Sequence, residues 1–194
     1  MGNLQDEQYK KGREGEKHVA SQIATCGYKV LYIGGCQLYH ITGEKYYSVD
    51  LEFFGEGKTI WVQVKNKPPR KKYPDTGMEW WRYQHLVKHQ KESGLPVLVL
   101  FTDTDGNKLI YGEWLNNITN CQSNMGFNGN GKTGDTMIYW YIPRDWGHQK
   151  PIPKNSATLR TLAELFTVEK RETRALAKRF EDTNMFEAIQ CPPK

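Results

Sequence analysis

Long apolar runs are missing from this chain of 194 residues. A helix that spans a bilayer needs about 20 consecutive apolar residues, and no segment approaches that length. Residues 1–17 are polar and lack the apolar centre of a secretion signal. We therefore expect a soluble protein of the cytoplasm that has no membrane partner.

Cysteine is also sparse, and its spacing excludes two common kinds of site. The chain has four cysteines, and no two of them form a CxxC pair. Zinc ribbons and thioredoxin-type centres are built on that spacing, so neither is expected. In a reducing compartment these cysteines are expected to be free thiols.

The composition supports a folded domain and is compatible with a polyanionic partner. Hydrophobic residues make up 38% of the chain and charged residues 25%, which is enough apolar material for a packed core. The formal net charge is +5. Segment 65–72 carries five positive charges in eight residues. Such a run is usually a solvated loop, and it is also compatible with contacts to a polyanion.

Apolar periodicity and turn residues predict an alternation of helices and strands. The predicted order is helix 12–25, strands 28–33, 46–54 and 59–65, helix 78–93, and strands 95–101, 109–115 and 137–143. The second and third strands are joined by a short Gly-containing turn, which predicts an antiparallel hairpin. Strand 95–101 is almost wholly apolar, as in a strand buried on both faces. The fold class predicted is α/β, with a mixed central sheet flanked by helices.

The domain organisation follows from the same pattern. Residues 1–150 are predicted to form one domain, with a frayed start at 1–11. Segment 116–135 is rich in asparagine and glycine, which indicates a long loop or insertion. Segment 151–194 is predicted to be a C-terminal helical appendage, because its apolar residues recur at helical spacing after a proline-rich linker.

Four polar residues are placed to form a metal site. Glu16 lies near the start of the first helix, Asp50 in the second strand, and Gln63 and Lys65 at the end of the third strand. Residues two apart in a strand point to the same face, so Gln63 and Lys65 share a face. A hairpin would bring the Asp50 carboxylate beside the Gln63 amide. Hard divalent cations prefer oxygen ligands of this kind.

These residues resemble the motif of the PD-(D/E)xK nuclease superfamily, which includes the archaeal Holliday-junction resolvases and many restriction enzymes. That pattern has a helix with a glutamate, an aspartate on the second strand, and an acidic residue, any residue and a lysine on the third. Segments 12–16, 48–51 and 62–65 occupy those places in order. The resemblance covers residues 10–115 and implies a restriction-endonuclease-like fold with an αβββαβ core.

The resemblance also implies roles for the site residues. Asp50, Gln63, the Val64 carbonyl and Glu16 are expected to hold Mg²⁺ or Mn²⁺. Lys65 is expected to position or activate the attacking water. The catalytic residues predicted are therefore Glu16, Asp50, Gln63 and Lys65.

One position departs from the family pattern, and two glutamates compete for roles. Gln63 stands where an acidic residue is usual, and its missing negative charge should weaken metal affinity. Glu52 is a candidate to compensate, because it lies two residues from Asp50. Glu14 competes with Glu16, and Glu16 is also explained as a first-turn residue favoured by the helix dipole.

Nucleic-acid contacts are predicted on the basic segment and the helix after it. The residues predicted to contact DNA are Lys67, Arg70, Lys71, Lys72, Tyr83 and Gln84. The tryptophans next to them, Trp80 and Trp81, are expected to cover the sheet.

The function predicted is a metal-dependent endonuclease that hydrolyses phosphodiester bonds of DNA, although the sequence does not separate DNA from RNA. A homodimer is expected by analogy only. Two alternatives stay open. One is a nucleic-acid-binding module of the same fold that has weak or no catalysis because of Gln63. The other is a partner-binding protein of a mobile element that uses the C-terminal helices.

Overall fold

A mixed six-stranded sheet forms the centre of the protein. The computed structural model describes residues 4–33, 37–39, 45–47, 49–55, 57–68, 70, 73, 75–106, 108–118, 123–128, 135–142 and 157–167. The strands of the central sheet, in spatial order, are β1 (Lys29–Tyr32), β4 (Leu51–Gly55), β5 (Lys58–Asn66), β7 (Val97–Thr102), β8 (Ile110–Trp114) and β11 (Arg160–Thr161). Strands β5 and β7 are parallel, and the other neighbours are antiparallel.

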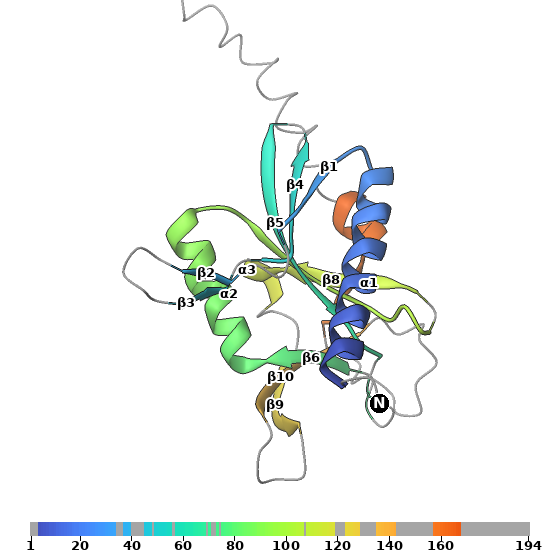
Figure 1. The fold of residues 1–194 in the computed structure, drawn as a ribbon, viewed down its shortest axis with the longest axis vertical. Helices are drawn as coiled ribbons and strands as arrows, with labels where there is room; N and C mark the ends of the chain where they lie inside the picture. The colour runs from blue at the N-terminus through green and yellow to red at the C-terminus, as the bar shows by residue number, and fades with distance from the viewer. Residues whose placement is uncertain are drawn as a thin grey trace, which may run out of the picture.

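Two helices cover the two faces of this sheet. Helix α1 (Leu4–Thr25) lies on one side and α2 (Trp80–Ser93) on the other, as Figure 1 shows in blue and green. Two apolar clusters fill the spaces between helices and sheet. The α1-side core includes Val19 and Ile23 of α1, and the α2-side core includes Tyr83 and Leu86 of α2. The predicted α/β class with a mixed central sheet between helices is confirmed.

The position of strand β7 between the two cores explains why residues 97–101 are all apolar. Leu98 and Leu100 belong to the α1-side core, whereas Val97, Val99 and Phe101 belong to the α2-side core. All six residues of the strand are buried. The prediction that this strand is buried on both faces is therefore confirmed.

Smaller strands extend the α2 side. β6 (Asp75–Glu79), β10 (Asp135–Tyr141) and β9 (Ser123–Asn128) form a three-stranded sheet, and β2 (Gln37–Tyr39) pairs with β3 (Lys45–Tyr47). A short helix, α3 (Leu115–Ile118), follows β8. Trp140 of β10 packs against Phe101 of β7 at a ring-centroid distance of 6.1 Å, so the second sheet shares the α2-side core.

The predicted second strand, 46–54, is wrong as a single strand. It is divided into β3 and β4, and Asp50 lies at a bend immediately before β4. The Asp50 carboxylate accepts a hydrogen bond from the Val64 N–H at 2.7 Å. The predicted hairpin is confirmed, because β4 and β5 are antiparallel with Leu51 opposite Val62.

Both main helices differ from their predicted starts. Helix α1 begins at Leu4, so residues 4–11 are helical and the predicted fraying is wrong for them. Helix α2 begins at Trp80, because residues 78 and 79 end strand β6 and pair with β10. Gly94 ends α2 in the left-handed region at φ 71°, and its N–H donates to the Gln90 carbonyl.

The prediction of a loop over 116–135 is wrong where α3 and β9 lie. Strand β9 pairs with β10 in antiparallel register, with Met125 opposite Ile138. Residues 119–122 and 129–134 lie outside the described residues. The interpretation of those stretches as an insertion stays a prediction.

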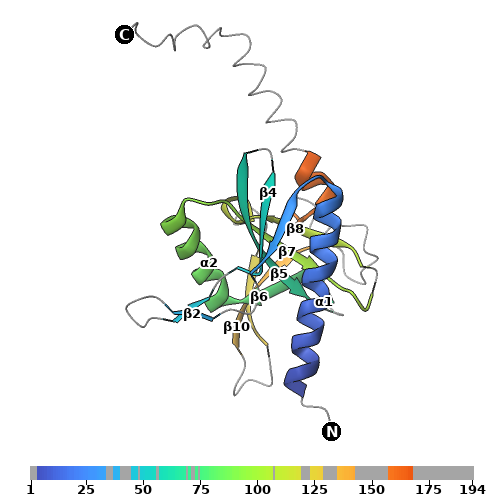
Figure 2. The same ribbon diagram turned by 45° about the horizontal axis from the view of Figure 1, so that its top comes forward.

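The segment after residue 151 contributes to the central sheet. Residues 160–161 form β11 and pair with β8, so the helical prediction is wrong there, and a helical turn follows at 162–167. Leu165 and Phe166 are buried in the α1-side core, beside α1 as the orange ribbon in Figure 2 shows. Residues 168–194 lie outside the described residues, and the domain boundary near 151 stays a prediction. Among the described helices, none is both long and apolar enough to cross a membrane.

Candidate functional site

A pocket of about 380 Å³ collects side chains from α1, β5 and the start of α2. The residues that line it are Gln8, Lys11, Gly12, Glu16, Asp50, Gln63, Val64, Lys65, Asn66, Trp81 and Arg82. The four residues predicted to be catalytic, and Val64 with them, thus line one pocket. Glu14 and Glu52, the two competing glutamates, are not among the residues that line it.

A close contact between α1 and β5 brings Glu16 to the pocket. A Cβ on Gly15 would lie 2.4 Å from the Cβ of Asn66, so only glycine allows this approach. The Asn66 amide nitrogen donates to the Lys11 carbonyl at 2.6 Å and to the Thr104 hydroxyl at 2.7 Å. Asn66 therefore joins α1, β5 and the turn after β7, and fixes the helix turn that carries Glu16.

The Asp50 carboxylate is largely buried, and its pKa is higher than usual. Burial raises the pKa of Asp50 to about 6, and the negative charge of Glu16 adds to this effect. The hydrogen bond from the Val64 N–H and the positive charges of Arg82 and Lys65 act in the opposite direction. A carboxylate whose charge is disfavoured by burial and by a second carboxylate is an arrangement that a divalent cation relieves.

The Gln63 side chain lies in the centre of the site, and its amide nitrogen faces the carboxylate. Nε2 of Gln63 donates to Asp50 Oδ2, and it lies 3.2 Å from the Val64 carbonyl oxygen. Its Oε1 points the other way and accepts a hydrogen bond from Arg82 Nε at 2.9 Å. The Gln63 nitrogen therefore contacts an oxygen of Asp50 and the oxygen of Val64, two of the four residues predicted to bind metal.

Arg82 is a site residue that the sequence prediction missed. It is only 8% exposed, and its Nη2 lies 4.0 Å from Asp50 Oδ1. A signal for it existed, because Arg82 lies four residues before the buried Leu86 and so falls on the apolar face of α2. A cation on the buried face of a helix needs a polar partner.

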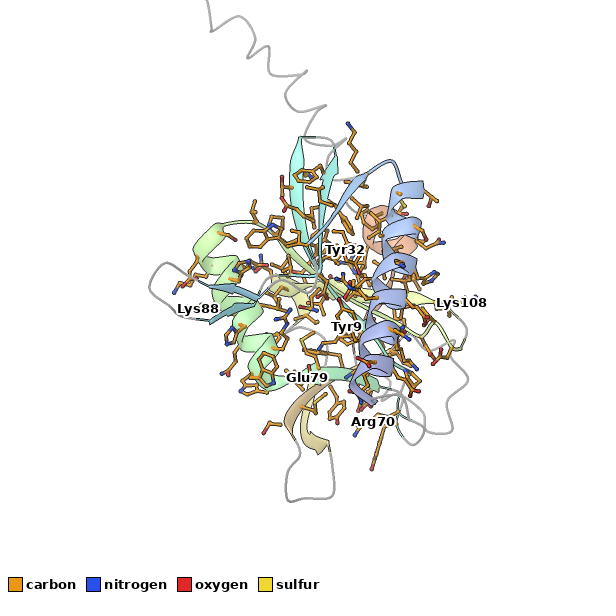
Figure 3. The ribbon with its side chains drawn as sticks, viewed as in Figure 1. Tyr9, Tyr32, Arg70, Glu79, Lys88 and Lys108 are labelled. Atoms are coloured by element: carbon orange, nitrogen blue, oxygen red, sulfur yellow. The ribbon has the colours of Figure 1, made fainter. Side chains whose placement is uncertain are left out.

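Lys65 is held by Glu79, which the sequence prediction also missed. The Lys65 ammonium donates to Glu79 Oε2 at 2.7 Å, and Figure 3 labels Glu79 just before α2. Burial alone would raise the pKa of Glu79, but the charge of Lys65 and its hydrogen bond lower it below the usual value. Glu79 is therefore ionised at neutral pH and directs the lysine. Nothing in its sequence neighbourhood indicated this pairing.

Glu16 is held from the α1 side of the pocket. Its Oε2 accepts a hydrogen bond from the Tyr32 hydroxyl and lies 3.3 Å from Nη1 of Arg13. The Arg13 guanidinium in turn lies over the rings of Tyr32 and Tyr9, which Figure 3 labels beside α1. This cluster of α1 and β1 residues fixes the direction of the Glu16 carboxylate.

The residues predicted to bind nucleic acid have different surroundings. Burial and the charge of Lys65 lower the pKa of Lys67 to about 8, although Glu79 acts against this shift. The Arg70 guanidinium is bound by Asp75, with Nη2 2.6 Å from Oδ2, and lies over the Tyr139 ring, so it has a structural partner. Lys71 and Lys72 lie outside the described residues.

The predictions that Tyr83 and Gln84 contact nucleic acid both stay predictions. Tyr83 is buried in the α2-side core against Trp80 and Trp140. Gln84 is exposed on α2 and does not line the pocket. Trp81 is 41% exposed and lines the pocket, so the expectation that it covers the sheet is wrong.

The donor atoms fit a hard divalent cation. A carboxylate oxygen of Asp50 and the Val64 carbonyl oxygen converge on one point, and the Gln63 amide supplies a third oxygen after rotation about its last bond. The described residues contain no cluster of three or more histidine, cysteine, aspartate or glutamate side chains.

Comparisons with known proteins give similarity in structure only. No family model matches the chain, and none of the curated proteins does. The solved structures that resemble it include the following two. The Holliday junction resolvase Hjc of the archaeal hyperthermophile Archaeoglobus fulgidus is 11% identical with a TM-score of 0.44, over 66% of this chain and 86% of that one. The bacterial homing endonuclease I-Ssp6803I is 15% identical with a TM-score of 0.49, over 91% of this chain and 99% of that one. At these values neither similarity assigns an activity to this chain.

Proposed function

We propose that this chain is an endonuclease that uses Mg²⁺ or Mn²⁺ to hydrolyse phosphodiester bonds of DNA. The observation that carries the proposal is the convergence of Asp50 Oδ2 and the Val64 carbonyl in a pocket that also holds Glu16 and the Lys65 ammonium. Oxygen donors beside a fixed cation suit a reaction in which negative charge accumulates on phosphate oxygens.

Each side chain has a definite task in this proposal. Asp50, the Val64 carbonyl and Gln63 hold the metal, and Glu16 binds it directly or through water. The bound ion supplies Lewis acidity and lowers the pKa of a coordinated water. The Lys65 ammonium, directed by Glu79, hydrogen-bonds the attacking water and offsets charge on the phosphate. Lys11 and Lys67, one in the pocket wall and one two residues beyond Lys65, suit the flanking phosphates.

The test is cleavage of plasmid and branched DNA in the presence of Mg²⁺, Mn²⁺ or EDTA. We expect cleavage with either metal and none in EDTA. Asp50→Ala and Lys65→Ala should each lower the rate by about a hundredfold or more, the range for a lost metal ligand or proton-transfer group.

Matched controls come from the exposed side of α2. Lys88 and Glu92 form a surface ion pair at 3.8 Å with side chains 67% and 52% exposed. Lys88→Ala and Glu92→Ala remove the same kinds of charge outside the pocket and should leave the rate unchanged. Wild-type cleavage that persists in EDTA, or in both pocket variants, would contradict the proposal.

A non-catalytic nucleic-acid-binding module is the second candidate. It is favoured by the position of Gln63 Nε2, a hydrogen-bond donor, between the two oxygens that a metal would need. Calorimetry separates the two candidates. DNA affinity without any Mn²⁺ binding identifies the module, whereas Mn²⁺ binding that is lost in Asp50→Ala identifies the metal site. The homodimer expected by analogy stays a prediction.

A further inference from the structure

The direction of the Gln63 amide is decided by Arg82. Gln63 is 2% exposed and Arg82 is 8% exposed, so neither side chain can turn away into solvent. With Oε1 on Arg82 Nε and Nε2 on Asp50, both of these hydrogen bonds join a donor to an acceptor. The reverse orientation would set the amide N–H groups against the Arg82 N–H and the amide oxygen against the Asp50 carboxylate. The arginine thus selects one of the two orientations.

This orientation is the wrong one for binding a cation. The oxygen of Gln63 that would complete a donor set with Asp50 and the Val64 carbonyl is bound by Arg82. The nitrogen of the same amide lies where a cation would contact Asp50 and Val64. Arg82 and a metal ion therefore compete for a single oxygen atom, and binding of the ion requires the amide to rotate and the Arg82–Gln63 hydrogen bond to break.

We propose that Arg82 is a positioning residue that holds the Gln63 amide in the orientation that excludes metal, and so lowers the metal affinity of the free protein. This inference rests on the proposed metal site. A glutamate at position 63 would escape the competition, because a carboxylate can give one oxygen to Arg82 and the other to the metal. The glutamine in this chain makes metal affinity depend on where the Arg82 side chain is held.

The test is Mn²⁺ binding measured by calorimetry, with no DNA present, in four proteins: wild type, Arg82→Met, Gln63→Glu, and the double variant. In the glutamine background, Arg82→Met should tighten Mn²⁺ binding about tenfold, the effect of one charge-assisted hydrogen bond. Removing a positive charge also favours a cation, but that effect is present in both backgrounds. The gain from Arg82→Met should therefore be several-fold smaller when residue 63 is glutamate.

Arg82→Lys separates charge from geometry and also guards against misfolding of the methionine variant. Lysine keeps the positive charge but has no nitrogen at the Nε position, so its Mn²⁺ affinity should also exceed that of the wild type. A second readout is hydrogen exchange of the Gln63 side-chain amide, which should be slow in the wild type and faster in both Arg82 variants. Circular dichroism confirms that each variant is folded.

The outcomes are distinct for the inference and for the proposed function. Equal gains from Arg82→Met in the two backgrounds, or a lysine variant no tighter than the wild type, overturn the inference because charge alone then explains the effect. Absence of Mn²⁺ binding in all the variants also overturns it. Mn²⁺ binding with the expected pattern, but without DNA cleavage, supports the inference and overturns only the proposed function.

Discussion

At the scale of single residues, the Asp50 carboxyl makes the stability of the fold depend on pH. Its pKa is raised from 3.8 to about 6 in the folded protein, mainly by burial. A carboxyl with a raised folded-state pKa destabilises the fold above that pKa, and the penalty disappears as the pH falls through the window from about 6 to about 4. The ionised Asp50 carboxylate thus lowers the free energy of unfolding of the metal-free protein at neutral pH.

Asp50→Asn should therefore stabilise the protein at about pH 7.5, and the gain should vanish near pH 4. The free energy of unfolding by urea, measured in EDTA, should exceed that of the wild type by at most about 3 kcal/mol at the higher pH. A variant that is less stable than the wild type at neutral pH would contradict the burial argument. Glu92→Gln, an exposed change of the same kind on α2, should show no such pH dependence.

The Lys65–Glu79 ion pair predicts a second residue-scale effect. Glu79→Gln removes the charge that directs the Lys65 ammonium, so kcat should fall roughly tenfold to a hundredfold. Mn²⁺ affinity should change little, because Glu79 does not line the pocket that holds the proposed ligands. Kinetics and calorimetry on the same preparation check both parts. A loss of Mn²⁺ binding with unchanged kcat would instead make Glu79 a ligand.

At the scale of elements, the approach of α1 to β5 depends on the absence of a side chain at Gly15. Gly15→Ala would gain about 1 kcal/mol of helix propensity, but its Cβ would press on Asn66 Cβ, which is held close to the backbone. We expect net destabilisation of about 1–2 kcal/mol from this overpacking, and weaker cleavage because Glu16 is displaced.

Gly12→Ala is the matched control on the same helix. A Cβ at Gly12 meets no atom within 4 Å, so only the gain in helix propensity remains. Thermal unfolding should therefore show a lower Tm for Gly15→Ala and an equal or higher Tm for Gly12→Ala. Equal shifts in the two variants would mean that α1 has room to move away from β5.

The sequence predicted the elements that bear strong apolar periodicity and missed those ordered by tertiary pairing. The α1 face, the β4–β5 hairpin and the buried β7 were predicted, because each carries its own periodic signal. Strand β6 was missed since Gly77 and Thr76 give it little strand character, and its order comes from pairing with β10. Asp50 was placed in a strand because the local pattern does not reveal the bend at residue 50.

Within the site, too, local sequence pattern predicted some residues and missed those placed by tertiary structure. The strand period placed Gln63 and Lys65 on one face, and the resemblance to a nuclease motif pointed to Glu16 and Asp50. All four residues line one pocket. Glu79 reaches Lys65 only through the way α2 is joined to β6, which no spacing encodes. Tyr83 was predicted to contact the substrate from its helix, and Trp140 of the second sheet packs against its ring.

At the scale of the whole molecule, residues 157–167 complete both cores. Leu159 lies in the α2-side core, while Leu165 and Phe166 lie in the α1-side core. Arg160 of β11 also donates from Nε to Glu113 of β8 at 2.6 Å. The sequence suggested a separate appendage here because helical propensity does not show which surface a short segment covers.

Phe166→Ala should therefore lower the free energy of unfolding of the entire domain by about 3–5 kcal/mol. Phe166 is 4% exposed, and its ring centroid lies 5.3 Å from that of Tyr28. Thr167→Ala, an exposed neighbour, should cost well under about 1 kcal/mol. Urea unfolding followed by tryptophan fluorescence measures both. A small effect of Phe166→Ala would show that the segment does pack as an independent appendage.

Strands β5 and β7 are neighbours in the sheet, yet residues 67–96 lie between them in the chain. During synthesis on the ribosome, β5 emerges before β7. The edge of β5 that pairs with β7 therefore has no partner strand until residue 102 has emerged. Arg82 and Trp81 reach the pocket on the connecting helix, and Thr104 anchors Asn66 from beyond β7. A growing chain thus has no assembled site, and the cleavage proposed above would be confined to molecules in which β7 has paired with β5.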